Sequence, residues 1–85
     1  MNAIEWKLKA LKQLKKIPTD YQKSITRAVD GLAEFPAGAA DVKALRGHAC
    51  GYRLRVGRYR VLFNFDGEVQ IVTVEEVRKR DEQTY

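Results

Sequence analysis

The sequence contains very little cysteine, since Cys50 is its only one. A chain with a single cysteine cannot form an internal disulfide, so its core must be held together by packing alone. The lack of disulfides is usual for proteins of reducing compartments. We therefore expect a protein of the cytoplasm.

Long hydrophobic runs are also missing. No apolar segment approaches the roughly 18 residues of a membrane span, and lysines from Lys7 onward interrupt any signal-peptide-like stretch near the N-terminus. We therefore expect neither membrane insertion nor secretion. The 85 residues allow one domain, residues 1–85, and argue against a multidomain enzyme. A hydrophobic content of 45% is sufficient for a folded core.

Histidine and cysteine, the usual ligands of zinc, are scarce as well. The single histidine, His48, lies two residues before Cys50 in a segment expected to be a loop. Two ligands are too few for a zinc site, so we expect no metal and no cofactor. A nucleophilic Cys50–His48 pair would need a third group to orient the histidine. None is evident in the sequence.

Positive charge is in excess. The chain has 16 Lys and Arg against 11 Asp and Glu, a formal net charge of +5, which favours an anionic partner such as nucleic acid, phosphate or an acidic protein. Most lysines lie at or before Lys23, whereas most arginines lie at or after Arg46. Lysine suits a solvated helix surface, and arginine binds phosphate through paired hydrogen bonds. The second half is therefore the expected anion site.

The first 35 residues show helical periodicity interrupted by proline. Residues 3–6 predict a short strand. Leucine or isoleucine then recurs every three residues, which predicts an amphipathic helix over about 7–16 that Pro18 ends. A second helix stops before Pro36, so the two form a hairpin. The residues expected to cap the start of the second helix are Thr19 or Asp20.

The second half alternates polar and apolar residues, as half-buried strands do. Strands are predicted over 52–56, 58–65 and 68–74, and Asp66-Gly67 is a strong hairpin signal between the last two. The predicted order is β-α-α-β-β-β. This is an α+β fold with a helical hairpin packed on a small antiparallel sheet.

Hairpin geometry brings four arginines together. A two-residue loop at 56–57 would place Arg55 opposite Arg58, and the same register pairs Arg53 with Arg60. Alternate residues of a strand point to one side, so all four would share one face. The repulsion between them is offset if an anion such as phosphate binds there. The alternative is a solvated face paired with one of three acidic residues: Glu75, Glu76 or Asp81.

The opposite face is the expected seat of the helices, with Tyr52, Leu54, Tyr59, Val61 and Phe63. A turn at Asp66-Gly67 would pair Arg60 with Thr73 and bring odd-numbered residues of the last strand onto the arginine face. Without a bulge, that pattern reaches Lys79. The chain then ends at Tyr85, whose ring would lie beside a basic run, and a frayed terminus is the alternative reading.

Several motifs follow one another along the chain: Lys43-Ala44-Leu45-Arg46-Gly47, Tyr52-Arg53-Leu54-Arg55-Val56, Arg58-Tyr59-Arg60-Val61-Leu62-Phe63 and a basic stretch ending in Tyr85. In this order and spacing they resemble the RelE/ParE superfamily of toxins from bacterial toxin–antitoxin pairs. The resemblance covers nearly the whole chain. It implies a RelE-type fold, an antitoxin partner and cleavage of mRNA in the ribosomal A site, by attack of a ribose 2′-OH on the adjacent phosphate.

The resemblance also implies a basic catalytic set, comprising Arg53, Arg55, Arg60, Tyr85 and either Lys79 or Arg80. The predicted RNA-binding set is Arg53, Arg55, Arg58, Arg60 and Arg78. Arginine hardly deprotonates, so Arg53 and Arg55 are poor general bases where a lysine could serve. The remaining candidates for the base are Lys79, Tyr85 or a ribosomal group.

Three functions compete at this point. The first is a ribosome-dependent endoribonuclease that an antitoxin neutralises by covering the arginine face. The second is a ParE-like toxin that inhibits DNA gyrase by binding, without RNA chemistry. The third is a binding module of the same fold without toxicity. The basic residues and the final tyrosine favour the first.

Overall fold

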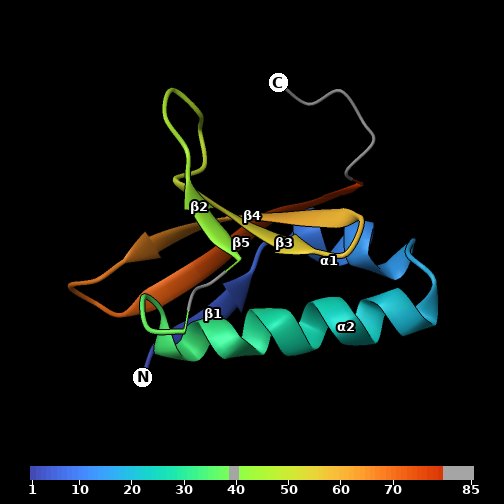
Figure 1. Ribbon diagram of the computed structural model, residues 1–85, viewed down its shortest axis with the longest axis horizontal. Helices are drawn as coiled ribbons and strands as arrows, with labels where there is room; N and C mark the ends of the chain where they lie inside the picture. Colours follow the sequence, from blue (N-terminus) through green and yellow to red (C-terminus); the bar gives the residue numbers. More distant parts are fainter. Residues whose placement is uncertain (39–40, 80–85) are drawn as a thin grey trace.

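The computed structural model describes residues 1–38 and 41–79. The strands are β1 (Ala3–Trp6), β2 (Val42–Ala44), β3 (Tyr52–Val56), β4 (Tyr59–Asp66) and β5 (Ile71–Lys79). The helices are α1 (Leu8–Lys15), α2 (Thr19–Asp30) and the short 3₁₀ helix η1 (Gly31–Glu34). The predicted α+β fold is confirmed, with two helices packed on one mostly antiparallel sheet (Figure 1).

The sheet has the strand order β1-β5-β4-β3-β2. Neighbouring strands of the sheet are antiparallel, except that β1 is parallel to β5. The prediction missed β2, because three residues are too few to show strand alternation. The first strand of the chain is thus paired with the last one. The helices α1 and α2 follow β1 and connect it to the rest of the sheet.

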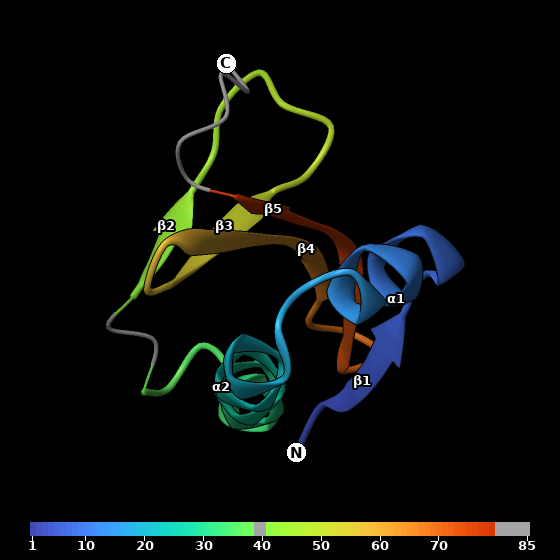
Figure 2. The same cartoon turned by 90° about the vertical axis from the view of Figure 1, so that its right-hand side faces the viewer.

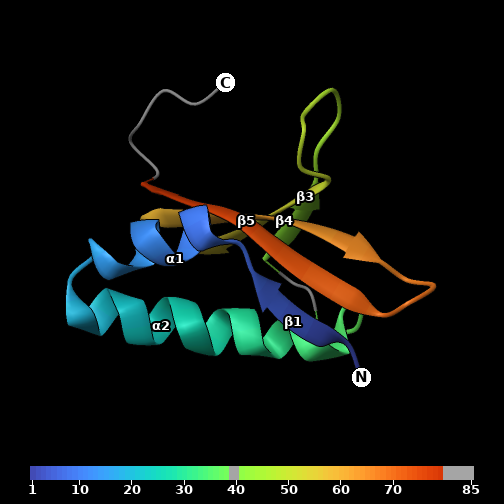
Figure 3. The same cartoon turned by 180° about the vertical axis from the view of Figure 1, so that it is seen from behind.

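The two helices occupy different positions on the sheet. Figure 2 shows α2 beneath one face and α1 beside β5. Pairing of β1 with β5 ends at Trp6 and Val74, and Figure 3 shows α1 continuing along β5 from there. The side-chain oxygen of Gln13 accepts the backbone N–H of Val77 at 2.7 Å. A helix side chain thus satisfies an edge donor that no strand pairs.

The buried face of α1 differs from the predicted leucine stripe. Of the predicted stripe, Leu14 and Ile17 pack against the core. Leu8 is 66% and Leu11 36% exposed, and Ala10 is fully buried instead. At α2, Pro18 precedes the first helical residue and no side chain caps it, so the predicted cap by Thr19 or Asp20 is wrong. No helix within the described ranges is long and apolar enough to cross a membrane.

The core lies between α2 and the sheet, as predicted. Leu54, Tyr59, Val61 and Phe63 are buried there, and Tyr52 packs against them. The Phe35 ring lies at the centre of an aromatic group, with ring centroids 5.1, 5.4 and 4.9 Å from Tyr52, Phe63 and Phe65, respectively. Edge-on contacts of this kind add to the stabilisation from burial alone.

The first hairpin turns at Gly57-Arg58 rather than at 56–57. Val56 pairs with Tyr59, and Gly57 has a φ of 57°. Arg58 has no such positive φ, and a positive φ at the first of two loop residues is typical of a II′ turn with glycine at that position. The need for this backbone conformation places Gly57 inside the turn and moves the β3–β4 register by two residues.

The second hairpin has a four-residue loop, residues 67–70, instead of a tight turn at Asp66-Gly67. Asp66 pairs with Ile71. The Asp66 carboxylate accepts the backbone N–H groups of Glu68 at 3.0 Å and Val69 at 3.4 Å, so its side chain stabilises the wider loop. The register also shifts between Leu62 and Phe63, where β5 contains one extra residue.

We expect Phe63→Ala to lower the free energy of unfolding by about 3–5 kcal/mol, because it removes a fully buried aromatic ring and leaves a cavity. Urea unfolding measures the difference. Val69→Ala is the control, since Val69 is 61% exposed, and its effect should stay within about 0.5 kcal/mol. Similar losses in the two variants would contradict this description of the core.

Candidate nucleic-acid interface

Three arginines lie side by side across three strands. Arg55 of β3 pairs with Arg60 of β4, and Arg60 pairs with Arg78 of β5. Neighbouring strands are about 4.8 Å apart, so the outer two backbone positions are separated by roughly 10 Å. We call these three residues the arginine row. Arg53 lies on the same face two residues from Arg55, and the four residues together form the arginine face.

The predicted grouping of Arg53, Arg55 and Arg60 on one face therefore holds, but the predicted pairs are wrong. Arg53 lies opposite Leu62 rather than Arg60, and Arg55 lies opposite Arg60 rather than Arg58. The register moved by an even number of residues. A shift by an even number leaves each residue that is still within a strand on the same face of the sheet.

Arg58 does not belong to the arginine face. It lies in the turn between β3 and β4 and is exposed. Together with Tyr21 and Tyr59, it lines a groove beside the helices. The predicted place of Arg58 opposite Arg55 is wrong because the turn itself contains Arg58.

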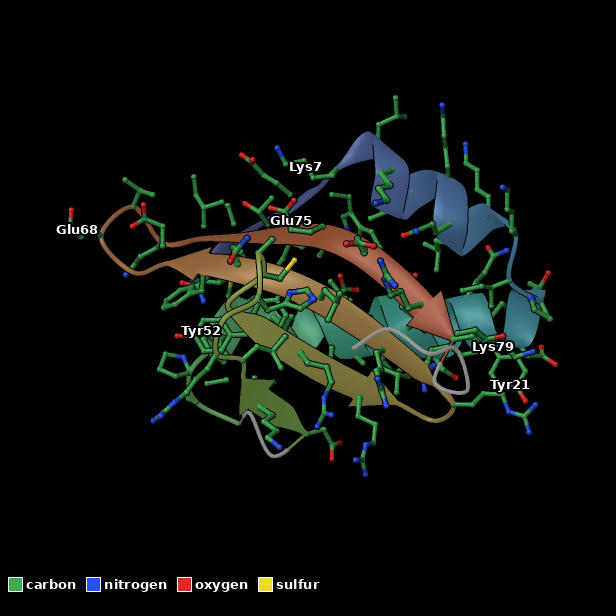
Figure 4. All side chains as sticks on the ribbon, turned by 90° about the horizontal axis from the view of Figure 1, so that it is seen from above. Lys7, Tyr21, Tyr52, Glu68, Glu75 and Lys79 are labelled. Carbon is green, nitrogen blue, oxygen red and sulfur yellow. The ribbon has the colours of Figure 1, made fainter. Side chains whose placement is uncertain are left out.

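The parity argument for Lys79 is also wrong. Lys79 pairs with Tyr59, a core residue, and Val77 is buried, so odd-numbered residues at this end of β5 belong to the helix-facing side. The extra residue in β5 produces this change, because the wide loop alone shifts the register by an even number of residues. Figure 4 shows Lys79 at the same end of the molecule as Tyr21. Arg80 and Tyr85 lie outside the described residues.

Arg78 is held by a carboxylate on the same strand. Its Nε and Nη2 atoms lie 2.9 and 2.8 Å from Oε1 of Glu76. Nζ of Lys9 on α1 reaches the same oxygen at 3.4 Å. Glu76, one of the acidic partners considered for the four predicted arginines, pairs instead with Arg78, and this pair fixes the guanidinium at the end of the row.

Glu76 is partly buried, and its pKa reflects two opposing effects. Burial alone would raise the pKa of Glu76, but the hydrogen bond and positive charge of Arg78, together with Lys9, lower it. Its carboxylate is therefore charged at neutral pH. The charged form is the one that orients Arg78.

The loop at 45–51, between β2 and β3, rises from the side of the sheet opposite α2 (Figure 1). Gly47 has a φ of 65°, which favours glycine at this position of the leucine–arginine–glycine motif. The backbone N–H of Gly51 donates to Oδ1 of Asn64 at 2.7 Å, and Nδ2 of Asn64 donates to Oε2 of Glu75 at 3.3 Å. These bonds tie the loop to the middle of the sheet.

Cys50 of this loop is buried and does not have the properties of a nucleophile. It is 4% exposed, and the pKa of its thiol is raised by burial first and then by the negative charges of Glu75 and Glu76. A nucleophilic cysteine needs a lowered pKa instead. His48 accepts the backbone N–H of Cys50 through Nδ1 at 3.1 Å, so the contact between these residues is a local turn.

A groove of about 630 Å³ lies next to the arginine face. Its apolar lining includes Ile17, Tyr21, Tyr59 and Val77, and the two tyrosine rings are 5.3 Å apart between centroids. Its charged lining consists of Lys9, Lys16, Arg58, Glu76, Arg78 and Lys79. We call it the basic groove. It joins residues from α1, the α1–α2 connection, α2, the β3–β4 turn, β4 and β5, so no local sequence motif could have revealed it.

Lys43 is a basic residue at the start of the motif at 43–47, for which the sequence pattern predicts no role. It lies directly opposite Arg53 across β2 and β3 and so belongs to the same face. The signal that could have found it is the pairing of β2 with β3. That signal was missing because β2 was not predicted. Within the part of the chain that the structure describes, no group of three or more His, Cys, Asp or Glu side chains could hold a metal ion.

Comparisons with known proteins define the class of this chain. Residues 4–84 match a family described as the ParE toxin of the type II toxin–antitoxin system parDE. A match over almost the whole chain shows that the protein belongs to this family of toxins, within the RelE/ParE superfamily. The comparison with curated protein sequences returns no match.

Solved structures agree with the fold. A chain of the archaeal RelE–RelB complex from Pyrococcus horikoshii is 21% identical with a TM-score of 0.81, and the match covers 95% of this chain and 97% of that one. The RelBE2 complex from Mycobacterium tuberculosis gives 23% identity, coverages of 93% and 98%, and a TM-score of 0.79. The match to the intact E. coli RelBE complex has 21% identity and a TM-score of 0.78, and it covers 96% of this chain and 100% of that one.

The lowered pKa of Glu76 predicts how stability depends on pH. Its ionised form contributes stability that is present above the ordinary carboxyl pKa of 4.5 and is lost as pH falls through the lower folded-state value. We expect the difference in unfolding free energy between the wild type and Glu76→Gln to shrink from about pH 6 to about pH 3.

Urea unfolding at a series of pH values measures this difference. Glu68→Gln, in the exposed loop, is the matched control and should give a nearly constant difference. A Glu76→Gln curve that stays parallel to the wild type over the whole range would rule out the contribution assigned to the Arg78 pair.

Proposed function

We propose that this toxin is a ribosome-dependent endoribonuclease that cleaves mRNA in the A site and so blocks translation. The observation that carries the proposal is the arginine row, in which Arg55, Arg60 and Arg78 stand next to one another across three strands. Like charges in adjacent cross-strand positions repel, and a bound phosphate removes that cost. The proposal places the toxin in the cytoplasm, with the ribosome and mRNA as partners.

The proposed reaction is an internal phosphoryl transfer. The ribose 2′ oxygen forms a bond to the adjacent phosphorus, and the bond from that phosphorus to the 5′ oxygen of the next nucleotide breaks. The products are a 2′,3′-cyclic phosphate and a free 5′-OH. Negative charge grows on the phosphoryl oxygens in the transition state, and guanidinium groups stabilise it. The role of Arg55 and Arg60 is this stabilisation.

Proton transfer needs a different group, because arginine remains protonated at neutral pH. The candidates are Lys79, Tyr85 and a ribosomal group. Lys79 pairs with Tyr59 on the helix-facing side of β5, which makes it the least suited of the three. We assign the stacking of a base to Tyr85 and phosphate contact to Arg80. The ribosome would hold the codon in line and exclude water.

A second candidate is inhibition of DNA gyrase by binding, without RNA cleavage. The specific observation in its favour is the family match, whose description names ParE toxins. The placement of Lys79 also favours it, because an inhibitor needs a complementary surface and no general base. The two candidates differ in what the arginine face must do, which makes them separable by substitution.

We expect Arg60→Gln to reduce cleavage of ribosome-bound mRNA at least about 100-fold, because it removes one charge from the centre of the arginine row. Tyr85→Ala should act in the same direction. The measurement is mRNA cleavage and translation arrest after expression in a bacterium. Lys23→Gln, on the exposed side of α2, is the control and should leave both unchanged.

Circular dichroism must show that the variants fold. Folded Arg60→Gln and Tyr85→Ala proteins that still cleave messages at the wild-type rate would show that the site is elsewhere. Intact messages together with a DNA-damage response to the wild type would favour gyrase inhibition instead.

We further propose that a cognate antitoxin inserts an acidic, amphipathic segment into the basic groove. Five cations line the groove against one carboxylate, Glu76, and the lining also includes apolar side chains such as Ile17 and Val77. Glu76 and Arg78 border both this groove and the arginine row. A segment bound in the groove would therefore extend over Arg78 and block access of RNA to the row.

We expect the double substitution Lys16→Glu/Arg58→Glu to weaken antitoxin binding at least about tenfold, because two rim charges then repel the acidic segment. Calorimetry with the purified antitoxin measures the change. Toxicity should persist, since neither residue belongs to the arginine face. Lys23→Glu/Arg27→Glu on α2 is the matched control. If the wild type, the groove variant and the α2 control bind the antitoxin with equal affinity, the antitoxin does not bind in the basic groove.

A further inference from the structure

We propose that Lys43 and Arg53 form a second phosphate subsite, which takes the RNA phosphodiester next to the one held by the arginine row. The proposal rests on the RNA-binding role of the arginine face given above. It adds a residue, Lys43, for which the sequence motifs suggested no function. It also adds a direction, because the RNA backbone would run along β3 from Arg55 to Arg53.

The backbone register places the two residues together. Lys43 of β2 pairs with Arg53 of β3, so their side chains leave the sheet on the same side. A small cavity of about 250 Å³ lies here, lined by Asp41, Val42, Lys43, Arg53 and Arg55. Three of its five lining residues are cations.

Arg53 has a donor atom that the fold leaves unsatisfied. Its Nε atom is buried without a hydrogen-bond partner, and a buried unsatisfied donor is costly. Within residues 1–38 and 41–79, the ion pairs are those of Glu76 with Lys9 and with Arg78, and neither involves Lys43, Arg53 or Arg55. The cavity thus contains positive charge that the described part of the fold does not neutralise.

Asp41 is the one carboxylate lining the cavity. Its backbone carbonyl accepts the N–H of Arg55 at 3.0 Å, which extends the pairing of β2 with β3. One carboxylate against three cations leaves a net positive charge, so the cavity attracts an anion. A phosphodiester has one negative charge and two free oxygens, which suits contact with Lys43 and Arg53 together.

The spacing of the two subsites suits a polynucleotide. Arg53 and Arg55 are two residues apart along β3, a distance of roughly 7 Å. This is of the order of the separation between neighbouring phosphates in an extended nucleotide chain. A ligand with one phosphate would occupy the arginine row, where three arginines lie on adjacent strands, and a ligand with two would also reach Lys43.

The test compares 2′-O-methyl dinucleotides and trinucleotides of uridine. They have one and two phosphodiesters, and they cannot be cleaved because the nucleophile is blocked. We expect Lys43→Gln to weaken trinucleotide binding about threefold at low salt. It should also reduce the slope of log affinity against log salt by about 0.7, the value for one phosphate contact in a single strand.

Dinucleotide binding should stay unchanged in Lys43→Gln, and Lys23→Gln, on α2, should leave both affinities unchanged. NMR titration measures the affinities and reports whether the Arg53 Nε–H signal moves on addition of the trinucleotide. The subsite is rejected if Lys43→Gln leaves trinucleotide binding unchanged, if it weakens both ligands equally, or if the wild type binds neither.

A parallel assay of mRNA cleavage on ribosomes separates this inference from the proposed function. Selective loss of trinucleotide affinity without any cleavage by the wild type would support the subsite and reject the endoribonuclease. Cleavage by the wild type with unchanged trinucleotide binding in Lys43→Gln would do the opposite.

Discussion

The register between β3, β4 and β5 is the constraint on which the rest of this structure depends. Gly57 adopts a positive φ within the first turn, and this brings Arg55 opposite Arg60. The extra residue in β5 then brings Arg78 opposite Arg60. A slip of one residue in either pairing would send guanidinium groups to the helix-facing side, where the core lies. The same backbone geometry therefore determines both the packing of the core and the position of the charges.

The positive charges of the arginine face have different surroundings at its two ends. At one end, Glu76 holds Arg78 and is itself supported by Lys9 from α1. At the other end, Lys43 and Arg53 face a small cavity. The Glu76 carboxylate contacts both Lys9 of α1 and Arg78, so it links α1 to the end of the arginine row. Glu76 also lines the basic groove. A partner bound in that groove would meet the row at Arg78, the arginine that Glu76 holds.

Much of the fold could be predicted because periodicity and proline act locally. The strand at 52–56 and the helical hairpin follow from alternation, from the apolar spacing and from Pro18 and Pro36. The pairing of Lys79 with Tyr59 could not be predicted. It depends on the wide loop that the Asp66 side chain stabilises and on the bulge in β5. Lys43 and the basic groove were missed for a related reason. Each depends on contacts between segments distant in sequence.

The most direct measurement of the central claim is the mapping of mRNA ends in a purified translation system to which the toxin has been added. An A-site endoribonuclease is expected to cut ribosome-bound messages within the A-site codon, leaving a 5′-OH on one fragment and a cyclic phosphate on the other, and to leave free RNA uncut. Uncut messages at a toxin concentration that still arrests bacterial growth would contradict the claim.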